Sequence, residues 1–324
     1  MKPNKYIIFF ARKLWFWGWS KLMNGFAPSD KNGNYKRPYG LFLDQTFQIN
    51  FQEENILYLL VGASCPWCHR TLLSYQLQDL SNVIKIIFLK PDINEGRWVF
   101  KEKFYGYKTL REIYKNSQNT FNILLPETLP LLVLSRNNKL RIISNESAGI
   151  LKYLNSITNH KTSNKDRIYQ SEEQFTELIH RKINNGVYKC GFARNQKSYL
   201  KASSELFNAL DLIESKLEES RGPWLYGKKI TIADIYLFPT MIRWELIYNK
   251  LFKCSEREIS DYKHIMKWRL NFYNYKDIEK TCLPSTWVED YYKSLFPLNP
   301  SQIVPVHDSL RNILEKGFNH KTSI

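Results

Sequence analysis

The chain of 324 residues is 43% hydrophobic and 15% aromatic, which excludes an intrinsically disordered protein and allows two domains, each with its own core. Its formal net charge of +16 favours anionic ligands. The lysines are scattered, however, and the sequence has no arginine-rich tract or aromatic RNA-binding signature. We therefore expect a solvated basic surface and no nucleic-acid partner.

The first 50 residues are predicted to form an irregular N-terminal extension that wraps on the fold. An apolar stretch at residues 6–11 is cut short by Arg12 and Lys13. No run approaches the roughly 20 apolar residues of a membrane span, so we expect no integral membrane association. The aromatic segment at residues 14–19 is predicted to cover a hydrophobic seam. Contact with a membrane surface and an organelle address are the alternatives.

A strand–helix–strand unit is predicted to open the organised part of the chain. Residues 56–61 are a short apolar run of the kind found in buried strands. After a turn at residues 62–64, leucines at helical spacing predict a helix that begins near Cys65. Residues 84–89 are predicted to form a second buried strand, and the helical crossover implies that the two strands run parallel.

Two further strands and a helix complete a predicted α/β thioredoxin-like domain at residues 51–160. Residues 131–134 and 140–143 are short apolar runs on either side of a polar turn, the pattern of a hairpin. A helix is expected to open at residues 144–147. The apolar residues of the polar and aromatic stretch at residues 90–125 follow neither the helical nor the strand repeat clearly, and this stretch is expected to be an insertion.

The rest of the chain, residues 161–324, is predicted to form an all-helical second domain with a C-terminal extension. Four residues repeat at i, i+4, i+7 and i+11, as in the apolar stripe of an amphipathic helix: Leu206, Leu210, Ile213 and Leu217. Residues 231–234 begin with Thr and end with Asp, which matches a capping box at a helix start. A polar linker is expected at residues 155–165.

The five cysteines, at positions 65, 68, 190, 254 and 282, do not form a disulfide framework. Their odd number and irregular spacing predict a reducing compartment, and we expect the protein in the cytoplasm.

The strongest chemical signal is the Cys-Pro-Trp-Cys sequence at residues 65–68. A thiol at a helix N-terminus faces unpaired backbone N–H groups and the positive end of the helix dipole, which lowers its pKa. Cys65 is therefore predicted to be a thiolate nucleophile at neutral pH. His69 and Arg70 are expected to add positive potential. Cys68 lies one turn further on, where it can act as a resolving thiol.

Three other interpretations of this sequence remain open. A cysteine can be buried for structural reasons alone, although a position between a strand and a helix argues against this. Half of a zinc site would need a second pair of ligands, and the sequence has no other CxxC or HxxxH pattern, so we expect no metal. Cys65-x-x-Cys68-His69 is also a haem attachment pattern, but such haem is attached outside the cytoplasm and no export signal is expected here.

A second set of residues fits a tripeptide ligand beside the thiol. Leu129-Pro130 precedes the third strand, and in a thioredoxin-like domain a proline there is cis and lies next to the reactive thiol. The residue before it then presents its backbone to a peptide. Glu146 and Ser147 at a helix start offer backbone donors and a hydroxyl to a carboxylate. Thiolate, backbone edge and anion-binding helix start are what glutathione requires.

Several separate stretches carry a resemblance to one known family. They are residues 65–71 (CPWCHRT), 96–100 (GRWVF), 144–147 (SNES), 183–193 (INNGVYKCGFA), 251–254 (LFKC) and 299–305 (NPSQIVP). Through them the chain resembles the glutathionyl-hydroquinone reductases, also called the Xi class of glutathione transferases. The resemblance implies a thioredoxin-like domain followed by an all-helical domain, glutathione as the co-substrate, and a homodimer.

By this resemblance, Cys65 attacks the sulfur of a glutathionyl-hydroquinone, releases the hydroquinone and remains as a mixed disulfide that a second glutathione reduces. The residues that the resemblance places at the glutathione are Trp98, Leu129 (through its backbone), Glu146 and Ser147. The residues that it places at the aromatic ring are Tyr188, Tyr248 and one of the pair Tyr291 and Tyr292. For each tyrosine, packing in the core is the alternative.

The chain also departs from the family pattern. Cys68 stands where members usually have alanine, so an internal Cys65–Cys68 disulfide could release glutathione without a second molecule. No basic residue occurs at positions 126–129, and Asp290 stands where relatives tend to have histidine. The alternative enzymes are a glutaredoxin-like or omega-like thiol transferase or a dehydroascorbate reductase. A non-catalytic binding protein on the same fold is the alternative from a different class.

Overall fold

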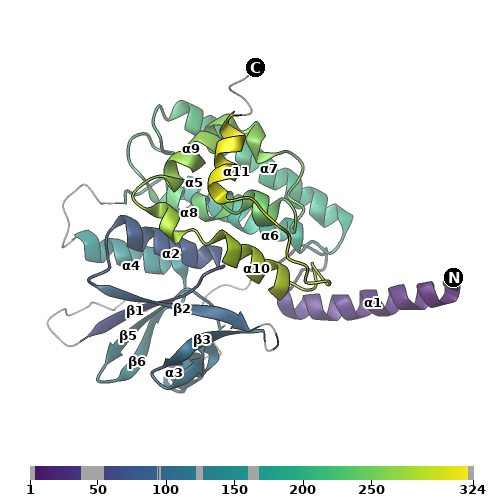
Figure 1. Ribbon diagram of the computed structural model, residues 1–324, viewed down its shortest axis with the longest axis horizontal. Helices are drawn as coiled ribbons and strands as arrows, with labels where there is room; N and C mark the ends of the chain where they lie inside the picture. Colours follow the sequence, from purple (N-terminus) through teal and green to yellow (C-terminus); the bar gives the residue numbers. More distant parts are fainter. Residues whose placement is uncertain are drawn as a thin grey trace.

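A six-stranded sheet forms the centre of the N-terminal domain (Figure 1). We describe a computed structural model of the chain at residues 4–37, 55–92, 94, 96–121, 127–159 and 168–319. The strands are β1 (Ile56–Gly62), β2 (Ile84–Asp92), β3 (Arg97–Phe104), β4 (Tyr107–Thr109), β5 (Leu131–Arg136) and β6 (Lys139–Ser144). Their order in the sheet is β4-β3-β2-β1-β5-β6.

The pairing of the strands confirms the expected thioredoxin-like arrangement. β1 pairs with β2 in parallel, as the helical crossover implied, and with β5 in antiparallel. β5 and β6 form the expected hairpin, whose turn holds Asn137 and Asn138 at positive φ. Asparagine tolerates this conformation better than most residues, which suits it to the turn. β1 is central in the sheet, and Leu59, Leu60 and Val61 are completely buried.

Three helices belong to this domain. α2 (Pro66–Leu77) and α4 (Ser147–Asn159) lie against each other on the face of the sheet that meets the second domain, and α3 (Leu110–Phe121) lies on the other side (Figure 1). The insertion expected at residues 90–125 is therefore largely structured, as the end of β2, β3, β4 and α3. α4 continues to Asn159, so residues 155–159 of the expected linker are helical, and residues 160–165 lie outside the described residues.

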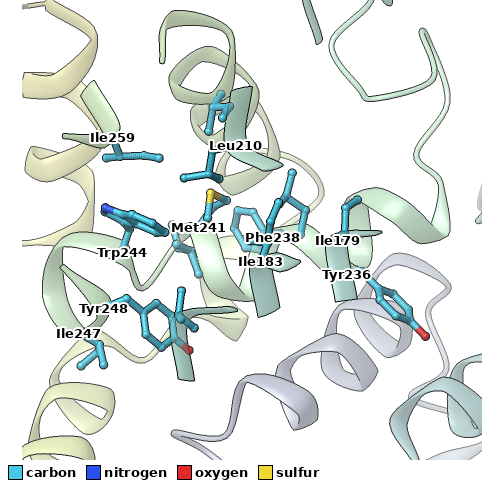
Figure 2. Close-up of a cluster of buried hydrophobic side chains, with 14 of the residues drawn as sticks. Ile179, Ile183, Leu210, Tyr236, Phe238, Met241, Trp244, Ile247, Tyr248 and Ile259 are labelled. Atoms are coloured by element: carbon cyan, nitrogen blue, oxygen red, sulfur yellow. The ribbon is translucent and has the colours of Figure 1, made fainter. Parts of the chain in front are cut away.

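All the regular elements of the second domain, within residues 168–319, are helices, as expected. Its helices and helical turns are α5 (Glu173–Leu178), η2 (Ile179–Asn184), α6 (Asn185–Gly191), α7 (Gln196–Glu219), α8 (Ile232–Met241), η3 (Trp244–Tyr248), η4 (Ile259–Asp261), α9 (Lys263–Tyr273), η5 (Ile278–Thr281), α10 (Pro284–Ser294) and α11 (Leu310–Asn319). The predicted stripe of α7 is buried in the core shown in Figure 2, where Leu210 faces Met241.

The predicted capping box starts α8. The backbone N–H of Thr231 donates to the Asp234 carboxylate at 2.9 Å, and the Thr231 hydroxyl donates to it at 2.8 Å. Asp234 also accepts hydrogen bonds from the Leu225 N–H and the Trp268 indole. This completely buried carboxylate therefore joins the start of α8 to α9 and to the loop that precedes α8.

The N-terminal extension differs most from expectation. Residues 5–26 form a regular helix, α1 (Lys5–Phe26), which projects from the body of the molecule (Figure 1). The prediction of an irregular segment is therefore wrong there: the stretch contains no proline, and Asn4 caps its first turn by accepting from the Tyr6 N–H. Residues 38–50 lie outside the described residues.

The aromatic segment at residues 14–19 does not cover a seam as a whole. The side chains of Leu14, Trp15 and Trp17 are between 61% and 70% exposed. Only the end of the segment meets the body, where the Trp19 indole donates to the Pro297 carbonyl at 3.0 Å. Within the described parts of the chain, no helix combines the length and apolarity needed to cross a membrane.

Candidate active site

Cys65 lies at the N-cap of α2, between the end of β1 and the first helical turn. Its backbone is extended, Pro66 takes the first helical position, and the Cys65 sulfur accepts from the Cys68 N–H at 3.4 Å. The half-buried sulfur also lies 3.8 Å from the Leu129 carbonyl oxygen, to which the thiol form donates. The backbone thus holds the sulfur at the helix end, where the dipole favours a negative charge.

The two cysteines of the motif have opposite properties. Burial raises the pKa of Cys65, but hydrogen bonds from Cys68, the positive charge of Arg37 and the Trp67 N–H outweigh burial and lower the pKa to about 7. Burial raises the pKa of Cys68 well above its usual value, and the neighbouring Cys65 sulfur raises it further. Cys68 is completely buried, and its sulfur accepts from the Gly62 N–H at 3.3 Å. Cys65 is therefore the thiolate and Cys68 the thiol.

Two guanidinium groups stack on the tryptophan between the cysteines. The Arg37 Cζ lies 3.4 Å from the centre of a Trp67 ring, and the Arg70 Cζ lies 4.3 Å from it. Burial lowers the pKa of Arg70 to about 10, so it stays charged at neutral pH. Both arginines therefore place positive charge near Cys65, Arg70 as expected and Arg37 from a segment that the sequence did not connect with the site.

His69 does not add the positive potential that the sequence suggested. Arg243 donates to its Nδ1 at 2.8 Å, so its Nε2 carries the proton and donates to the Thr281 hydroxyl at 2.8 Å. Burial and the charge of Arg243 lower the pKa of His69 well below its usual value. His69 is a neutral residue that joins α2 to the second domain, and the expectation of a charged imidazole is wrong.

A cavity of about 210 Å³ opens beside Cys65. Its walls come from both domains and include Cys65, Trp67, Trp98, Tyr188, Asp290 and Tyr291. The Tyr188 and Tyr291 hydroxyls are 2.7 Å apart, and the hydroxyl of the buried Tyr248 lies 3.4 Å from that of Tyr291. Burial raises the pKa of all three tyrosines, so they remain protonated hydrogen-bond donors at neutral pH.

Trp98 reaches the cavity because the residue beneath it is a glycine. A Cβ added to Gly62, the last residue of β1, would overlap the Trp98 ring. The tip of the ring can therefore lie against the backbone of Gly62. Leu129, which lies 3.8 Å from the sulfur through its carbonyl, precedes a cis Pro130, as the thioredoxin-like pattern predicted.

Glu146 and Ser147 lie together at the start of α4. The Glu146 carboxylate accepts from the Ala148 N–H and from the Ser147 hydroxyl, both at 3.2 Å. The carboxylate therefore occupies the end of its own helix, and it affects the pKa of Arg70 by its charge. Among the residues that the structure describes, no group of histidine, cysteine and acidic side chains could hold a metal ion.

Comparison with known proteins places this site in a family. Residues 170–275 match the family model of the C-terminal domain of glutathione S-transferases. The glutathionyl-hydroquinone reductase PcpF of Sphingobium chlorophenolicum is 31% identical over 77% of this chain and 82% of its own length. The glutathione S-transferase omega-like 2 of Schizosaccharomyces pombe is 31% identical over 76% of this chain and 83% of its own length.

A solved structure agrees with these relatives. The glutathione S-transferase Xi from Phanerochaete chrysosporium superposes with a TM-score of 0.78 at 27% identity, over 86% of this chain and 94% of that one. The chain belongs to the Xi-class glutathione S-transferases. It is an enzyme of the glutathione transferase family, with the thioredoxin-like and helical domains that the sequence predicted.

In this Xi-class enzyme, the residues proposed for the site divide into three groups. Those at the cavity itself are Cys65, Trp98, Tyr188 and Tyr291. Those next to a cavity residue are Cys68, Leu129 and Tyr248. Glu146 and Ser147 lie at the start of α4, and Tyr292 points elsewhere, since its hydroxyl donates to the Leu246 carbonyl at 3.5 Å.

Sequence reasoning missed three residues of the site. Arg37 follows no motif, and 28 positions separate it from Cys65, so no local signal could reveal it. Trp67 was noticed only as part of the cysteine motif. Asn184, which accepts a hydrogen bond from Arg70 and donates to the Tyr236 carbonyl at 2.9 Å, lies in the INNGVYK stretch that carried the resemblance.

Proposed function

We propose that this enzyme reduces glutathionyl-hydroquinones to hydroquinones, with glutathione as the reductant. The observation that carries the proposal is that Cys65, with its pKa lowered to about 7, faces a cavity lined by Trp98, Tyr188 and Tyr291. A thiolate, an apolar wall and phenol donors suit a substrate that joins a peptide thiol to a quinol ring. The relative PcpF, which carries this activity in its name, supports the same assignment.

In the first half-reaction, the Cys65 thiolate attacks the glutathione sulfur of the conjugate. A sulfur–sulfur bond forms, the bond between sulfur and ring carbon breaks, and its electron pair leaves on the ring carbon. That carbon takes up a proton from water, which gives the hydroquinone. The ring is reduced, and the two sulfurs are oxidised to a mixed disulfide.

In the second half-reaction, the thiolate of a free glutathione attacks the mixed disulfide on its glutathione sulfur. Oxidised glutathione leaves, and the electron pair returns to Cys65 as a thiolate. A cysteine pKa of about 7 suits both halves, because the thiolate is present at neutral pH as a nucleophile and is also a good leaving group.

The surrounding residues have separate roles in this proposal. The backbone of Leu129 pairs with the peptide part of glutathione, and Trp98 packs on it. Glu146 and Ser147 hold the end that carries an amino group and a carboxylate. Tyr188 and Tyr291 donate hydrogen bonds to the quinol oxygens, and Tyr248 orients Tyr291 through its hydroxyl.

A second candidate, a dithiol thiol transferase of the omega or glutaredoxin type, is favoured by one observation. The Cys65 and Cys68 thiols hydrogen-bond one another, so Cys68 could attack a mixed disulfide on Cys65. Against this route, Cys68 is completely buried, and its raised pKa keeps it protonated. The structure therefore favours the route in which Cys65 is the only reacting cysteine.

Two variants, Cys65→Ser and Cys68→Ala, distinguish these functions when they are compared with wild type, each assayed for release of hydroquinone and of oxidised glutathione. We expect wild type and Cys68→Ala to turn over the conjugate at similar rates and Cys65→Ser to be inactive. Reduction of mixed disulfides without turnover of the conjugate would replace the proposal by the dithiol function. Slow alkylation of Cys65 at neutral pH would indicate a non-catalytic binding protein.

The proposal also includes the cellular location and the oligomeric state of the enzyme. We place it in the cytoplasm as a homodimer, because all five cysteines are free thiols and the resemblance to the Xi class implies a dimer. Sedimentation velocity of the purified protein tests the dimer, and a single species at the monomer mass would contradict it.

A further inference from the structure

We propose that α1 is a membrane-surface helix, which binds the face of a bilayer that contains anionic lipids. Every residue from Asn4 to Trp17 is exposed, so most of the surface of the first three turns of this helix faces solvent. The helix projects from the body of the molecule (Figure 1). A helix that exposes so much apolar surface needs a partner to cover it.

Four strongly exposed apolar side chains form one stripe along the helix. They follow the spacing i, i+3, i+7, i+10 and are Ile7, Phe10, Leu14 and Trp17, with exposed fractions of 64%, 67%, 70% and 62%. At 3.6 residues per turn this spacing keeps all four on one face. Tyr6 lies beside the stripe, and Ile8, Trp15 and Phe16 carry exposed apolar surface onto the other faces of the helix. Tryptophan and phenylalanine on such a face are typical of helices that lie at the boundary between headgroups and acyl chains.

The charges of the helix identify the partner as an anionic surface. α1 carries Lys5, Arg12, Lys13 and Lys21 and no acidic residue, and the first acidic residue of the chain is Asp30. By the same helical spacing, Lys5 and Arg12 lie opposite the stripe, on a face that they share with Phe9 and Phe16, and Lys21 lies in line with the stripe. Long basic side chains there can reach anionic headgroups while the stripe enters the apolar boundary.

Other occupants of this face fit less well. A second copy of α1 would bring basic residues together with no acidic residue to meet them, in a chain whose net charge is already +16. A membrane span is excluded because no helix in the described parts of the chain is long and apolar enough. A partner with a negatively charged surface and an apolar layer beneath it can contact both the basic and the apolar side chains of the helix.

The other end of the helix is attached to the second domain. The Trp19 indole donates to the Pro297 carbonyl, the Arg194 guanidinium donates to the Ala27 carbonyl at 2.9 Å, and Met23 is completely buried. The C-terminal part of α1 is therefore fixed to the body of the molecule, and the exposed N-terminal part is available to the bilayer. Binding of α1 needs no change in the active site.

Co-sedimentation with lipid vesicles tests this proposal on the full chain. Vesicles of equal parts phosphatidylglycerol and phosphatidylcholine are compared with vesicles of phosphatidylcholine alone. We expect binding to the first and not to the second, and a loss of at least about tenfold in binding for Leu14→Glu. Replacement of Arg12 by Gln should weaken binding about fivefold.

The matched control is Leu212→Glu, which places the same charge at an exposed leucine of α7 that lies outside α1. We expect this variant to bind like wild type, and all variants to keep the wild-type rate of Cys65 alkylation as a check on folding. Equal binding of Leu14→Glu and wild type, or no binding by wild type, would overturn the proposal. So would a wild-type dimer that Leu14→Glu converts to monomer, because a second copy would then cover the stripe.

Discussion

The reactivity of Cys65 depends on a few groups around one sulfur atom. Two of them, the Cys68 and Trp67 N–H groups, belong to the first turn of α2 and therefore lie next to the N-cap residue Cys65. The third, Arg37, belongs to a distant segment that the fold brings over Trp67. The first two could be predicted from the motif, whereas the arginine depends on the tertiary structure.

The pH dependence of Cys65 alkylation should report this arrangement. We expect the rate of reaction with iodoacetamide to rise with a midpoint near pH 7, because the lowered pKa of Cys65 makes the thiolate the main species above that pH. Removal of the nearby charge in Arg37→Gln should raise the pKa of Cys65 and slow the reaction at pH 6 about threefold. Replacement of the exposed Arg181 by Gln is the matched control, and an equal effect there would contradict a local role for Arg37.

The hydroxyl of Tyr291 is the second feature at this scale. It lies between the hydroxyls of Tyr188 and Tyr248, at the wall of the cavity. Loss of it in Tyr291→Phe should reduce kcat/KM for a glutathionyl-hydroquinone about tenfold and leave the reduction of a small mixed disulfide unchanged. The control is Tyr292→Phe, since that hydroxyl donates to the Leu246 carbonyl outside the cavity. Equal losses on both substrates would remove Tyr291 from quinol recognition.

At the scale of single elements, β1 and α2 build the site together. β1 ends in Gly62 and α2 begins after Cys65, so three residues turn the chain from sheet to helix. This close turn leaves the N–H groups of the first helical turn directed at the sulfur. The apolar run, the proline and the leucine spacing predicted both elements.

A methyl group at the end of β1 should disturb the site without unfolding the sheet. In Gly62→Ala the new Cβ would overlap the Trp98 ring, so the ring must move away from the cavity. We expect KM for glutathione to rise about tenfold and the free energy of unfolding to fall by about 1–2 kcal/mol. Gly18→Ala, where a Cβ meets nothing within 4 Å, serves as the control. An unchanged KM in Gly62→Ala would show that the position of Trp98 does not matter for glutathione.

At the scale of the whole molecule, α2 is the element that both domains share. His69 hydrogen-bonds Thr281 and Arg243, and Arg70 donates to Asn184, all in the helical domain. In the other direction, the Trp287 indole donates to the Ala63 carbonyl beside the site at 3.0 Å. The helix that carries the nucleophile, and the turn before it, are therefore tied to the helical domain by several hydrogen bonds.

These contacts make stability depend on pH. Burial and Arg243 lower the pKa of His69 well below its usual value, and burial and Arg70 lower that of His180 to about 3. Both histidines return to a pKa of about 6.5 on unfolding. Below that pH the unfolded chain binds more protons, so the free energy of unfolding should fall by up to about 1.4 kcal/mol per pH unit for each histidine.

Urea unfolding at several pH values between 5 and 7.5 measures this slope. The stabilisation by both histidines is fully present above about pH 6.5 and is lost as the pH falls. His69→Gln should reduce the slope, whereas replacement of the half-buried His307 by Gln should leave it unchanged. An unchanged slope in His69→Gln would mean that His69 is already protonated in the folded protein.

The amino-acid sequence by itself determined the elements whose signals are local. Apolar runs predicted β1, β2, β5 and β6, periodicity predicted α7, and the spacing of Thr231 and Asp234 predicted the start of α8. The nucleophile could also be predicted from a local signal, because a cysteine at a helix start has its pKa lowered by the backbone N–H groups of that helix.

Only the tertiary structure decided which distant groups meet at that cysteine and which apolar groups remain uncovered. It stacked Arg37 on Trp67, buried His69 as a neutral residue and brought Tyr188 against Tyr291. It also left most of the aromatic residues of α1 in solvent, although the sequence suggested a covered seam. The reason is physical: burial and the sign of a site's charge are sums over neighbours far apart in the chain, which no local pattern contains.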